Sequence, residues 1–473
     1  MYLHKFSYIF ILIYLASCNL APVFNKPATE QHQSFKYQAF ADSLASVPFD
    51  TTWWSYFDDT TLTKIIEQVS ANNNNLKAAH HNVERFRSFA RVERSRLLPE
   101  INLDASATGR VISQNSAQSF QSNKFINYDL RGLASYQIDL WGQLKNYYKA
   151  SMINAEISLL EYYNLRMALQ AQAASIYMSI RQLDRQIALY DSTIVLRRQS
   201  FRIATMNYQA GATDALDQAR AETQLRTAES ERWTFLNQRA RLENALAVLT
   251  GQEPVNFSLP VQPLDSLPVI VPTKIPSVVL QQRPDVWIAL KSMEAENALI
   301  GAEKANLYPR ITLNANAGYQ GRELNNVLTP ESFSWSLGGG LLQPLFNFGR
   351  NKARLEAQKN RYLQVADLYQ QSVLNAFKEV EDELANIYFL QNQYQRELET
   401  VASANRALNL ARQRYEAGLV SYLEVVDAER TALLNQGDLV TIIGQLYQGV
   451  INLSLVTGGN FNPDSASSNP SVY

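Results

Sequence analysis

Residues 143–210 decide the fold. They read QLKNYYKASMINAEISLLEYYNLRMALQAQAASIYMSIRQLDRQIALYDSTIVLRRQSFRIATMNYQA and contain neither glycine nor proline. A continuous α-helix of this length would be roughly 100 Å long, because each residue adds about 1.5 Å. Helices of globular proteins rarely exceed about 20 residues, so this stretch predicts a coiled coil or a rod. Residues 350–417 form a second stretch of the same kind.

Both stretches have the apolar spacing of a coiled coil. In the first, Arg197 is the one interruption of a series of apolar side chains at steps of three and four: Ile176, Ile180, Leu183, Ile187, Tyr190, Ile194, Phe201, Ala204 and Tyr208. In the second, Glu397 interrupts the series Ile387, Leu390, Tyr394, Val401, Ala404, Leu408, Ala411 and Tyr415. A period of 3.5 residues predicts a left-handed seam against a neighbouring helix.

Each long stretch is followed by a glycine and then by another helical segment. Gly211 and Gly418 are expected to end the long helices. Helices over 213–250 and 421–457 then return along them. The sequence therefore predicts two long helical hairpins, with the two glycines at the hairpin tips.

The two halves of the chain are similar in sequence at a nearly constant separation. The matching segments are 98–103 with 308–313, 141–142 with 348–349, 208–211 with 415–418, and 249–251 with 456–458. This similarity indicates a tandem duplication of roughly 190 residues. The first repeat is expected over 61–251 and opens with a helix over about 61–97. The second is expected over 277–458 and opens with a helix over about 284–307. A proline-rich linker, 252–276, joins them.

Four segments have the period of two that is typical of β-strands. They lie near 99–112, 126–140, 309–321 and 332–346. In the first, apolar Ile101 and Leu103 alternate with polar Asn102 and Asp104, so that one face is apolar and the other polar. Each segment has about the 10 residues that a tilted strand needs to cross a bilayer, and aromatic residues at the ends fit a membrane interface. The predicted fold class is thus mixed α and β.

Four strands cannot close a membrane barrel by themselves. The smallest such barrels have about eight strands, and an open edge in lipid leaves backbone groups unsatisfied. If these strands cross a membrane, the chain must therefore oligomerise, and two, three or four copies would give about 8, 12 or 16 strands. The alternative is a small soluble sheet at the end of a helical bundle.

The N-terminus has the pattern of a secretory signal. Residues 1–17 combine Lys5 with an apolar run that is too short for a transmembrane helix of about 20 residues. Leu15-Ala16-Ser17-Cys18 resembles a lipobox, so we expect cleavage before Cys18 and lipidation of that residue. Asn19 is compatible with delivery to the outer membrane. A lipid-anchored, extended segment is expected over 18–60, and a flexible tail over 459–473.

Composition excludes several classes of function. The chain has 43 basic and 44 acidic residues, which gives no electrostatic case for nucleic-acid binding. Its single cysteine rules out a disulfide within the chain and a cysteine-cluster metal site. His80 and His81 are neighbours, but without a third ligand nearby they are better interpreted as part of a solvated helix face. No motif of a catalytic or phosphate-binding site occurs, so we expect neither an enzyme nor a cofactor.

Several motifs, in this order along a duplicated chain, are similar to those of a known family. They are Trp53-Trp54-x-x-Phe57, Asp139-Leu140-Trp141-Gly142, Arg283-Pro284-Asp285-Val286, Gln343-Pro344-Leu345-Phe346-Asn347-Phe348-Gly349, and Tyr-x-x-Gly before each return helix. Together with the lipobox, they resemble the TolC-like outer-membrane factors, specifically the NodT-type lipoproteins that serve resistance-nodulation-division pumps. The resemblance covers nearly the whole chain after Cys18.

The resemblance implies a homotrimer with a 12-stranded β-barrel in the outer membrane and a long α-helical barrel in the periplasm. It implies a passive exit duct for small molecules, docked to a periplasmic adaptor protein and an inner-membrane pump, with outer-membrane lipid around the barrel. Two alternatives stay open: a duct for type I protein secretion, and a non-conducting coiled-coil rod tethered to the envelope.

The resemblance also implies a closed aperture at the hairpin tips. In the family, acidic residues just after the second Tyr-x-x-Gly form rings there, and the matching positions are Glu424 and Asp427. Their first-half counterparts are Asp217 and Arg220. Where some members carry a basic latching residue two positions after the tip glycine, this chain has Val420, and Arg220 is a candidate substitute. The alternative is an ordinary solvated helix face.

Overall fold

The computed structural model describes residues 19–27, 35–37, 40, 53–113, 124–264, 283–459 and 461. The expected signal sequence, Cys18, the linker after residue 264 and the tail after residue 461 lie outside these ranges. The chain divides into two compact units, which we describe separately. The sheet unit comprises 1–28, 82–158 and 288–370, and the hairpin unit comprises 29–81, 159–287 and 371–473.

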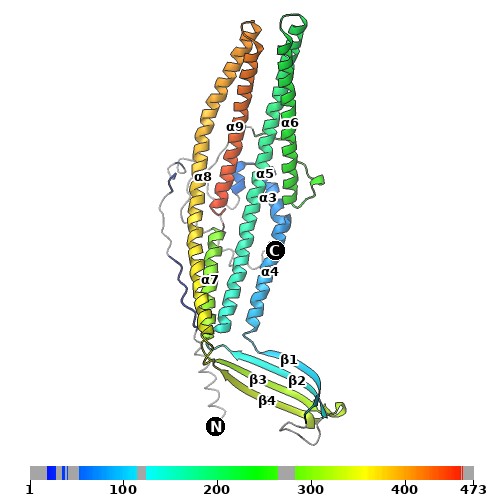
Figure 1. Ribbon diagram of the computed structural model, residues 1–473, viewed down its shortest axis with the longest axis vertical. Coiled ribbons are helices and arrows are strands. Elements are labelled where there is room, and N and C mark those ends of the chain that lie inside the picture. Colours follow the sequence, from blue (N-terminus) through cyan, green and yellow to red (C-terminus); the bar gives the residue numbers. More distant parts are fainter. Residues whose placement is uncertain are drawn as a thin grey trace. The chain divides into compact units, whose positions relative to one another are not determined.

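Two helical hairpins dominate the hairpin unit. The first is formed by α5 (Gln143–Gln209) and α6 (Ala215–Leu249), and the second by α8 (Arg350–Glu416) and α9 (Tyr422–Val456). The long helices have 67 residues each and the return helices 35 each, so both halves of the chain have the same element lengths. Figure 1 shows the first hairpin in cyan and green and the second in yellow, orange and red, with both turns at the same end of the unit.

The two hairpin turns have the same backbone geometry. Gly211 has φ +73° and Gly418 has φ +72°, in the left-handed region that favours glycine. The N–H of Gly211 donates to the carbonyl of Tyr208 at 2.9 Å, and the N–H of Gly418 donates to that of Tyr415 at 2.9 Å. The residue after each glycine donates to a carbonyl five positions earlier, also at 2.9 Å. This pair of bonds is the Schellman closure of a helix C-terminus, which explains why both long helices stop here.

The apolar core of the hairpin unit surrounds the middle of α5. The short helix η1 (Trp53–Phe57) and α3 (Thr60–Asn72) supply buried side chains to it. These are Trp53, Trp54, Leu62, Ile65, Ile66 and Val69, packed with Tyr177 and Ile180 of α5, Leu246 of α6 and Ile451 of α9. Burying one large apolar side chain contributes about 1.5–3 kcal/mol. The Trp53-Trp54-x-x-Phe57 motif is therefore part of the core.

The helix predicted over about 61–97 is interrupted, and that prediction was wrong in this respect. It forms two helices, α3 and α4 (Asn74–Ser95), which meet at Asn73. The Asn73 side chain accepts hydrogen bonds from the N–H groups of Asn75 and Leu76 at 2.9 and 3.2 Å, and donates to the carbonyl of Leu249 at 2.9 Å. Asparagine is a strong N-cap residue, so α4 begins anew where this side chain is fixed by α6.

α9 is long and apolar enough to cross a membrane by length and composition, the one such helix in the described part of the chain. However, 56% of its most apolar window is buried inside the protein. Gln448 donates to the carbonyl of Ser175 on α5 at 2.9 Å, and Asn452 donates to Glu383 on α8 at 3.2 Å. These contacts identify α9 as a core helix of the hairpin unit.

A buried ionic network fixes the start of the linker to the first hairpin. Asp184 on α5 is fully buried and accepts from Arg239 Nε at 2.6 Å and from the N–H of Gln262 at 2.9 Å. Arg181 donates to the carbonyl of Pro260 at 2.6 Å, and Arg239 donates to that of Leu259 at 2.9 Å. Buried charges are tolerated when they are paired and hydrogen-bonded. The network therefore holds residues 259–262 on the α5–α6 hairpin.

Four antiparallel strands form a single sheet in the sheet unit. β1 (Glu100–Val111), β2 (Lys124–Ile138), β3 (Arg310–Gly321) and β4 (Phe333–Leu342) lie in the order β1-β2-β3-β4. Figure 1 shows them side by side as one curved sheet. The strand predicted near 332–346 is shorter than expected, since β4 ends at Leu342. Pro344 follows, and it has no N–H to offer the ladder.

The register gives the sheet one polar and one apolar face. Ile311 of β3 pairs with Leu341 of β4, and the next residue, Thr312, pairs with Gly340 on the opposite face. The apolar face is uncovered: Leu103, Trp335 and Leu337 are 77, 71 and 72% exposed. Exposed apolar patches of this kind mark contact with a membrane or another protein. The strands are 12, 15, 12 and 10 residues long, enough to span a bilayer.

The residues just after Cys18 are fixed to the helical part of the sheet unit. Asn146 of α5 donates to the Asn19 side chain at 2.9 Å, and Asn297 of α7 (Pro284–Ala305) donates to the carbonyl of Pro22 at 2.9 Å. Gly301 of α7 permits this contact, because a Cβ there would lie 2.6 Å from Cβ of Ala21. The chain is thus held at α5 and α7 immediately after the lipidation candidate.

Candidate functional site

The predicted aperture residues lie at the start of α9, close to the hairpin turn. Glu424 and Asp427 are exposed, while Tyr422, Val425 and Val426 of the same turns are buried. The two carboxylates therefore occupy the solvent side of the helix, three residues apart. Their role as aperture residues stays a prediction.

Each of these carboxylates has a basic neighbour. Glu424 lies 3.8 Å from Nη1 of Arg414 on α8, and Asp427 lies 3.5 Å from Nη2 of Arg430, one turn further on. All four side chains are more than half exposed, so each pair contributes about 0–1 kcal/mol to stability. Neither carboxylate therefore has a strong partner within the described part of the chain.

The first-half counterparts pair with each other. Asp217 lies 3.6 Å from Arg220 on the same face of α6. Asp214 caps the helix by accepting from the N–H groups of Leu216 and Asp217 at 3.0 and 3.2 Å. Burial and the nearby Asp214 carboxylate raise the pKa of Asp217, and Arg220 opposes that shift. Arg220 thus pairs with a carboxylate of its own helix, and within the described part of the chain no ion pair joins it to the second hairpin.

An arginine that sequence reasoning treated only as an interruption is a central residue of this region. Arg197 of α5 is 5% exposed, and it donates from Nη1 to the carbonyl of Gln224 on α6 at 2.7 Å. Burial lowers the pKa of Arg197, and the carboxylate of Glu429 on α9 opposes this effect. The side chain remains charged, because an arginine does not lose its proton in proteins. Its hydrogen bond joins α5 to α6, and its charge attracts the Glu429 carboxylate of α9.

The partner carboxylate is also buried. Glu429 is 6% exposed, and its Oε1 accepts from Nη2 of Arg412 on α8 at 2.9 Å. Its Oε2 is buried and makes no hydrogen bond in the described part of the chain. We call Arg197, Arg412 and Glu429 the inter-hairpin cluster. Hydrogen bonds hold Arg197 within the first hairpin and Glu429 within the second, and the charges of these two residues attract each other. Periodicity could have found Glu429, because it continues a buried series at steps of three and four with Tyr422, Val425 and Ala432.

Apolar contacts connect the hairpins on the tip side of this cluster. Ala204 of α5 and Ala221 of α6 pack with Tyr422, Val425 and Val426 of α9, and Tyr415 of α8 lies against them. Burial and the Glu429 carboxylate raise the pKa of Tyr422 to about 12, so this phenol stays neutral. All four helices therefore meet in one cluster directly below the exposed carboxylates of α9.

The two histidines singled out in the sequence lie on α4. Their rings are 5.8 Å apart, and the His80 ring stands edge-on to Tyr162 of α5 at 6.4 Å. In the ranges that the structure describes, no group of three or more His, Cys, Asp or Glu side chains could hold a metal ion. His80 is thus engaged in aromatic packing.

Both halves of the chain match one family of outer-membrane proteins. The sequence matches the family described as outer membrane efflux protein twice, over residues 65–252 and 275–459. This chain therefore belongs to that family, which consists of efflux channels rather than enzymes, and it is a protein of the outer membrane.

Individual relatives agree with this assignment. The chain is 29% identical over 463 residues to the outer membrane protein OprJ of Pseudomonas aeruginosa, covering 96% of each chain. It is 29% identical over 458 residues to the probable outer membrane lipoprotein SilC of Salmonella typhimurium, covering 96% of this chain and 98% of SilC. Its fold matches that of the outer-membrane channel OprN with a TM-score of 0.88 at 23% identity, over 94% of this chain and 100% of OprN. The predicted family is thereby confirmed.

Proposed function

We propose that three copies of this chain form the outer-membrane exit duct of a tripartite efflux system. One observation carries the proposal: the sheet has an exposed apolar face, an opposite polar face and two open edges, β1 and β4. Unpaired edges and an uncovered apolar face are costly for a single chain in either water or lipid. Joining β4 of one copy to β1 of the next removes the edges, turns the apolar faces to lipid and encloses the polar faces.

The repeat supports a threefold assembly. The family match occurs twice, and both halves contain two strands and one hairpin of equal helix lengths, as expected for a tandem duplication. Three copies would supply six pseudo-equivalent halves, with 12 strands and six hairpins. Twelve tilted strands enclose a water-filled lumen, whereas barrels of about eight are filled by their own side chains. Lipidation at Cys18 would fasten each copy to the membrane through residues 19–22.

At the other end, we propose that Glu424 and Asp427 line a closed aperture. Threefold symmetry would stack two rings of three carboxylates, which favour cations and repel one another as the pore narrows. The inter-hairpin cluster would hold the hairpins in the closed arrangement. The tips would receive a periplasmic adaptor protein, and an inner-membrane pump of the resistance-nodulation-division class would supply the energy. In this proposal the pump selects the substrate, and the duct conducts it passively.

The experiment is single-channel conductance of the purified protein in planar bilayers, with Glu424→Ala/Asp427→Ala compared with wild type. We expect small, cation-selective openings in wild type, and openings several-fold larger with reduced selectivity in the variant. Asp438→Ala, an exposed acid on the same helix, is the control and should behave as wild type. Channels unaffected by the double substitution would place the gate elsewhere, and folded, inserted protein without any conductance would contradict the duct.

A further inference from the structure

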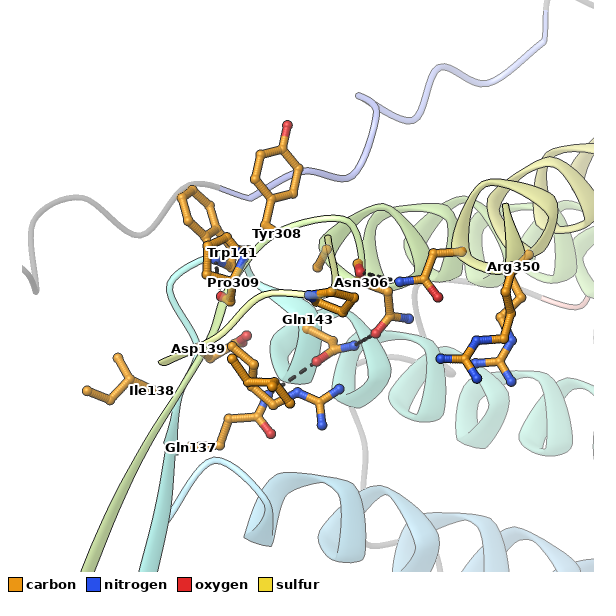
Figure 2. A pocket seen from close by; sticks show the side chains of 15 residues that line it. Gln137, Ile138, Asp139, Trp141, Gln143, Asn306, Tyr308, Pro309 and Arg350 are labelled. Atoms are coloured by element: carbon orange, nitrogen blue, oxygen red, sulfur yellow. Dashed lines mark hydrogen bonds between the residues drawn. The ribbon is translucent and has the colours of Figure 1, made fainter. Parts of the chain in front are cut away.

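The sheet unit contains a polar cavity where the strands meet the helices. Figure 2 shows it between the end of β2, the start of β3 and the neighbouring ends of α5, α7 and α8. Its volume is about 220 Å³, against about 30 Å³ for one molecule of liquid water. It can therefore hold a small oxyanion together with part of its hydration.

Three arginines line this cavity: Arg310 at the start of β3, and Arg350 and Arg354 in the first turns of α8. None of the three guanidinium groups makes an ion pair or a hydrogen bond within the described part of the chain. The one acidic side chain in the lining is Asp139, which accepts from the N–H of Lys145 at 2.8 Å and so caps the start of α5. The lining thus has an excess of positive charge.

The side-chain amides of the wall are bonded in a series. Gln137 donates to Gln143 at 3.2 Å, and Gln143 donates to Asn306 at 2.7 Å. Asn351 donates to the carbonyl of Asn306 at 2.8 Å. Dashed lines in Figure 2 mark hydrogen bonds between these residues. These amides form a fixed framework. The three arginines are exposed, so a ligand from solution can reach them, and their guanidinium groups can only donate.

We propose that this cavity binds a phosphate-type oxyanion, held by Arg310, Arg350 and Arg354. The planar fork of a guanidinium matches the oxygens of a phosphate in a two-pronged contact. α8 begins at Arg350, so its positive N-terminal end adds to the field of the three arginines. The ligand is either a free phosphate or the phosphate group of a lipid, since both present the same oxygens.

The register of the strands shows on which face of the sheet the cavity lies. Arg310 alternates with Ile311, and Gln137 pairs with Thr312, so Arg310 and Gln137 belong to the polar face. If the duct assembles as proposed above, this face lines the lumen and three copies of the cavity surround the passage. The site would then place anion-attracting charge at one end of a duct whose other end carries carboxylates.

The test is binding of inorganic phosphate to the purified full-length protein in phosphatidylcholine nanodiscs, measured by calorimetry. We expect wild type to bind phosphate and Arg350→Gln/Arg354→Gln to bind at least about tenfold more weakly, as expected for the loss of charge-assisted hydrogen bonds. Arg322→Gln, an exposed arginine beyond the opposite end of β3, is the matched control and should leave binding unchanged. Arg350→Lys keeps the charge without the fork and should bind with intermediate affinity.

A second arm distinguishes the two sources of phosphate. Protein from nanodiscs that contain phosphatidylglycerol is delipidated in neutral detergent, and the retained lipid is identified by mass spectrometry. Retention by wild type and loss in the double variant would identify a lipid headgroup as the ligand. The proposal is overturned if wild type binds neither probe, or if the double variant binds as wild type does. Because neither arm measures conduction, a negative result here leaves the duct itself standing.

Discussion

Replacing Asp184 with alanine is expected to lower the free energy of unfolding of the hairpin unit by about 3–5 kcal/mol. The carboxylate is fully buried and bonds Arg239 and Arg181 as well as the N–H of Gln262. Its removal leaves two buried guanidinium groups without their shared acceptor. Because the network also fixes the linker, the amide of Gln262 should exchange hydrogen much faster. Urea-induced loss of helical signal and hydrogen exchange measure the two effects.

The chain provides a matched control one heptad away. Asp191 pairs with Arg232 on the same two helices, but its side chain is half exposed. Asp191→Ala should therefore cost only about 0–1 kcal/mol. Combining each aspartate substitution with alanine at its arginine partner gives two double-mutant cycles. A coupling energy for Asp184 and Arg239 as small as that for Asp191 and Arg232 would contradict the role assigned to the buried network.

Replacing Arg197 with methionine is expected to weaken the proposed closed arrangement of the hairpins by about 1–3 kcal/mol. The substitution preserves much of the volume but removes the bond to the carbonyl of Gln224 and the positive charge that attracts the Glu429 carboxylate. In planar bilayers the variant should show larger or more frequent openings, and the tip residues of α5 and α6 should exchange amide hydrogens faster.

Arg198→Met is the control for this prediction. Arg198 is the next residue, but its side chain is 64% exposed and its bond to Glu229 lies on the surface at 3.3 Å. It should leave conductance unchanged and stability within about 0.5 kcal/mol. If the folded Arg197→Met variant conducts as wild type does, the prediction is contradicted. The inter-hairpin cluster would then stabilise the fold without controlling the opening of the aperture.

The parts of the fold that the sequence predicts well depend on local rules. The long helices follow from stretches without glycine or proline, and the turns follow from Gly211 and Gly418, because only glycine readily adopts the backbone angles found there. The break at Asn73 was missed because it depends on a bond to Leu249, a residue distant in sequence. The helical spacing of apolar residues continues across Asn73, so the break in the helix is set by a tertiary contact.

The same distinction applies to the sites. Glu424 and Asp427 could be selected because they follow a turn at a fixed distance, but the inter-hairpin cluster unites residues from three helices. Arg197 was noticeable in the sequence because it is a charged residue in an apolar series. Glu429, the carboxylate that attracts it, could not be identified without knowing that α9 packs against α5. The arginine cavity had no signal at all, since Arg310 is separated from Arg350 by two strands and their connections.

The most direct test of the central claim is disulfide cross-linking between β1 and β4. In one protomer these strands are three steps apart in the sheet, about 14 Å at about 4.8 Å per step, which is too far for a disulfide. We suggest Ser106→Cys combined in turn with Ser334→Cys, Ser336→Cys or Gly338→Cys, all on the polar face, with Ser106→Cys alone as the control. The account predicts that at least one pair gives a denaturant-resistant ladder ending at three chains. A ladder that ends at two or four chains, or no cross-link in any pair, would contradict it.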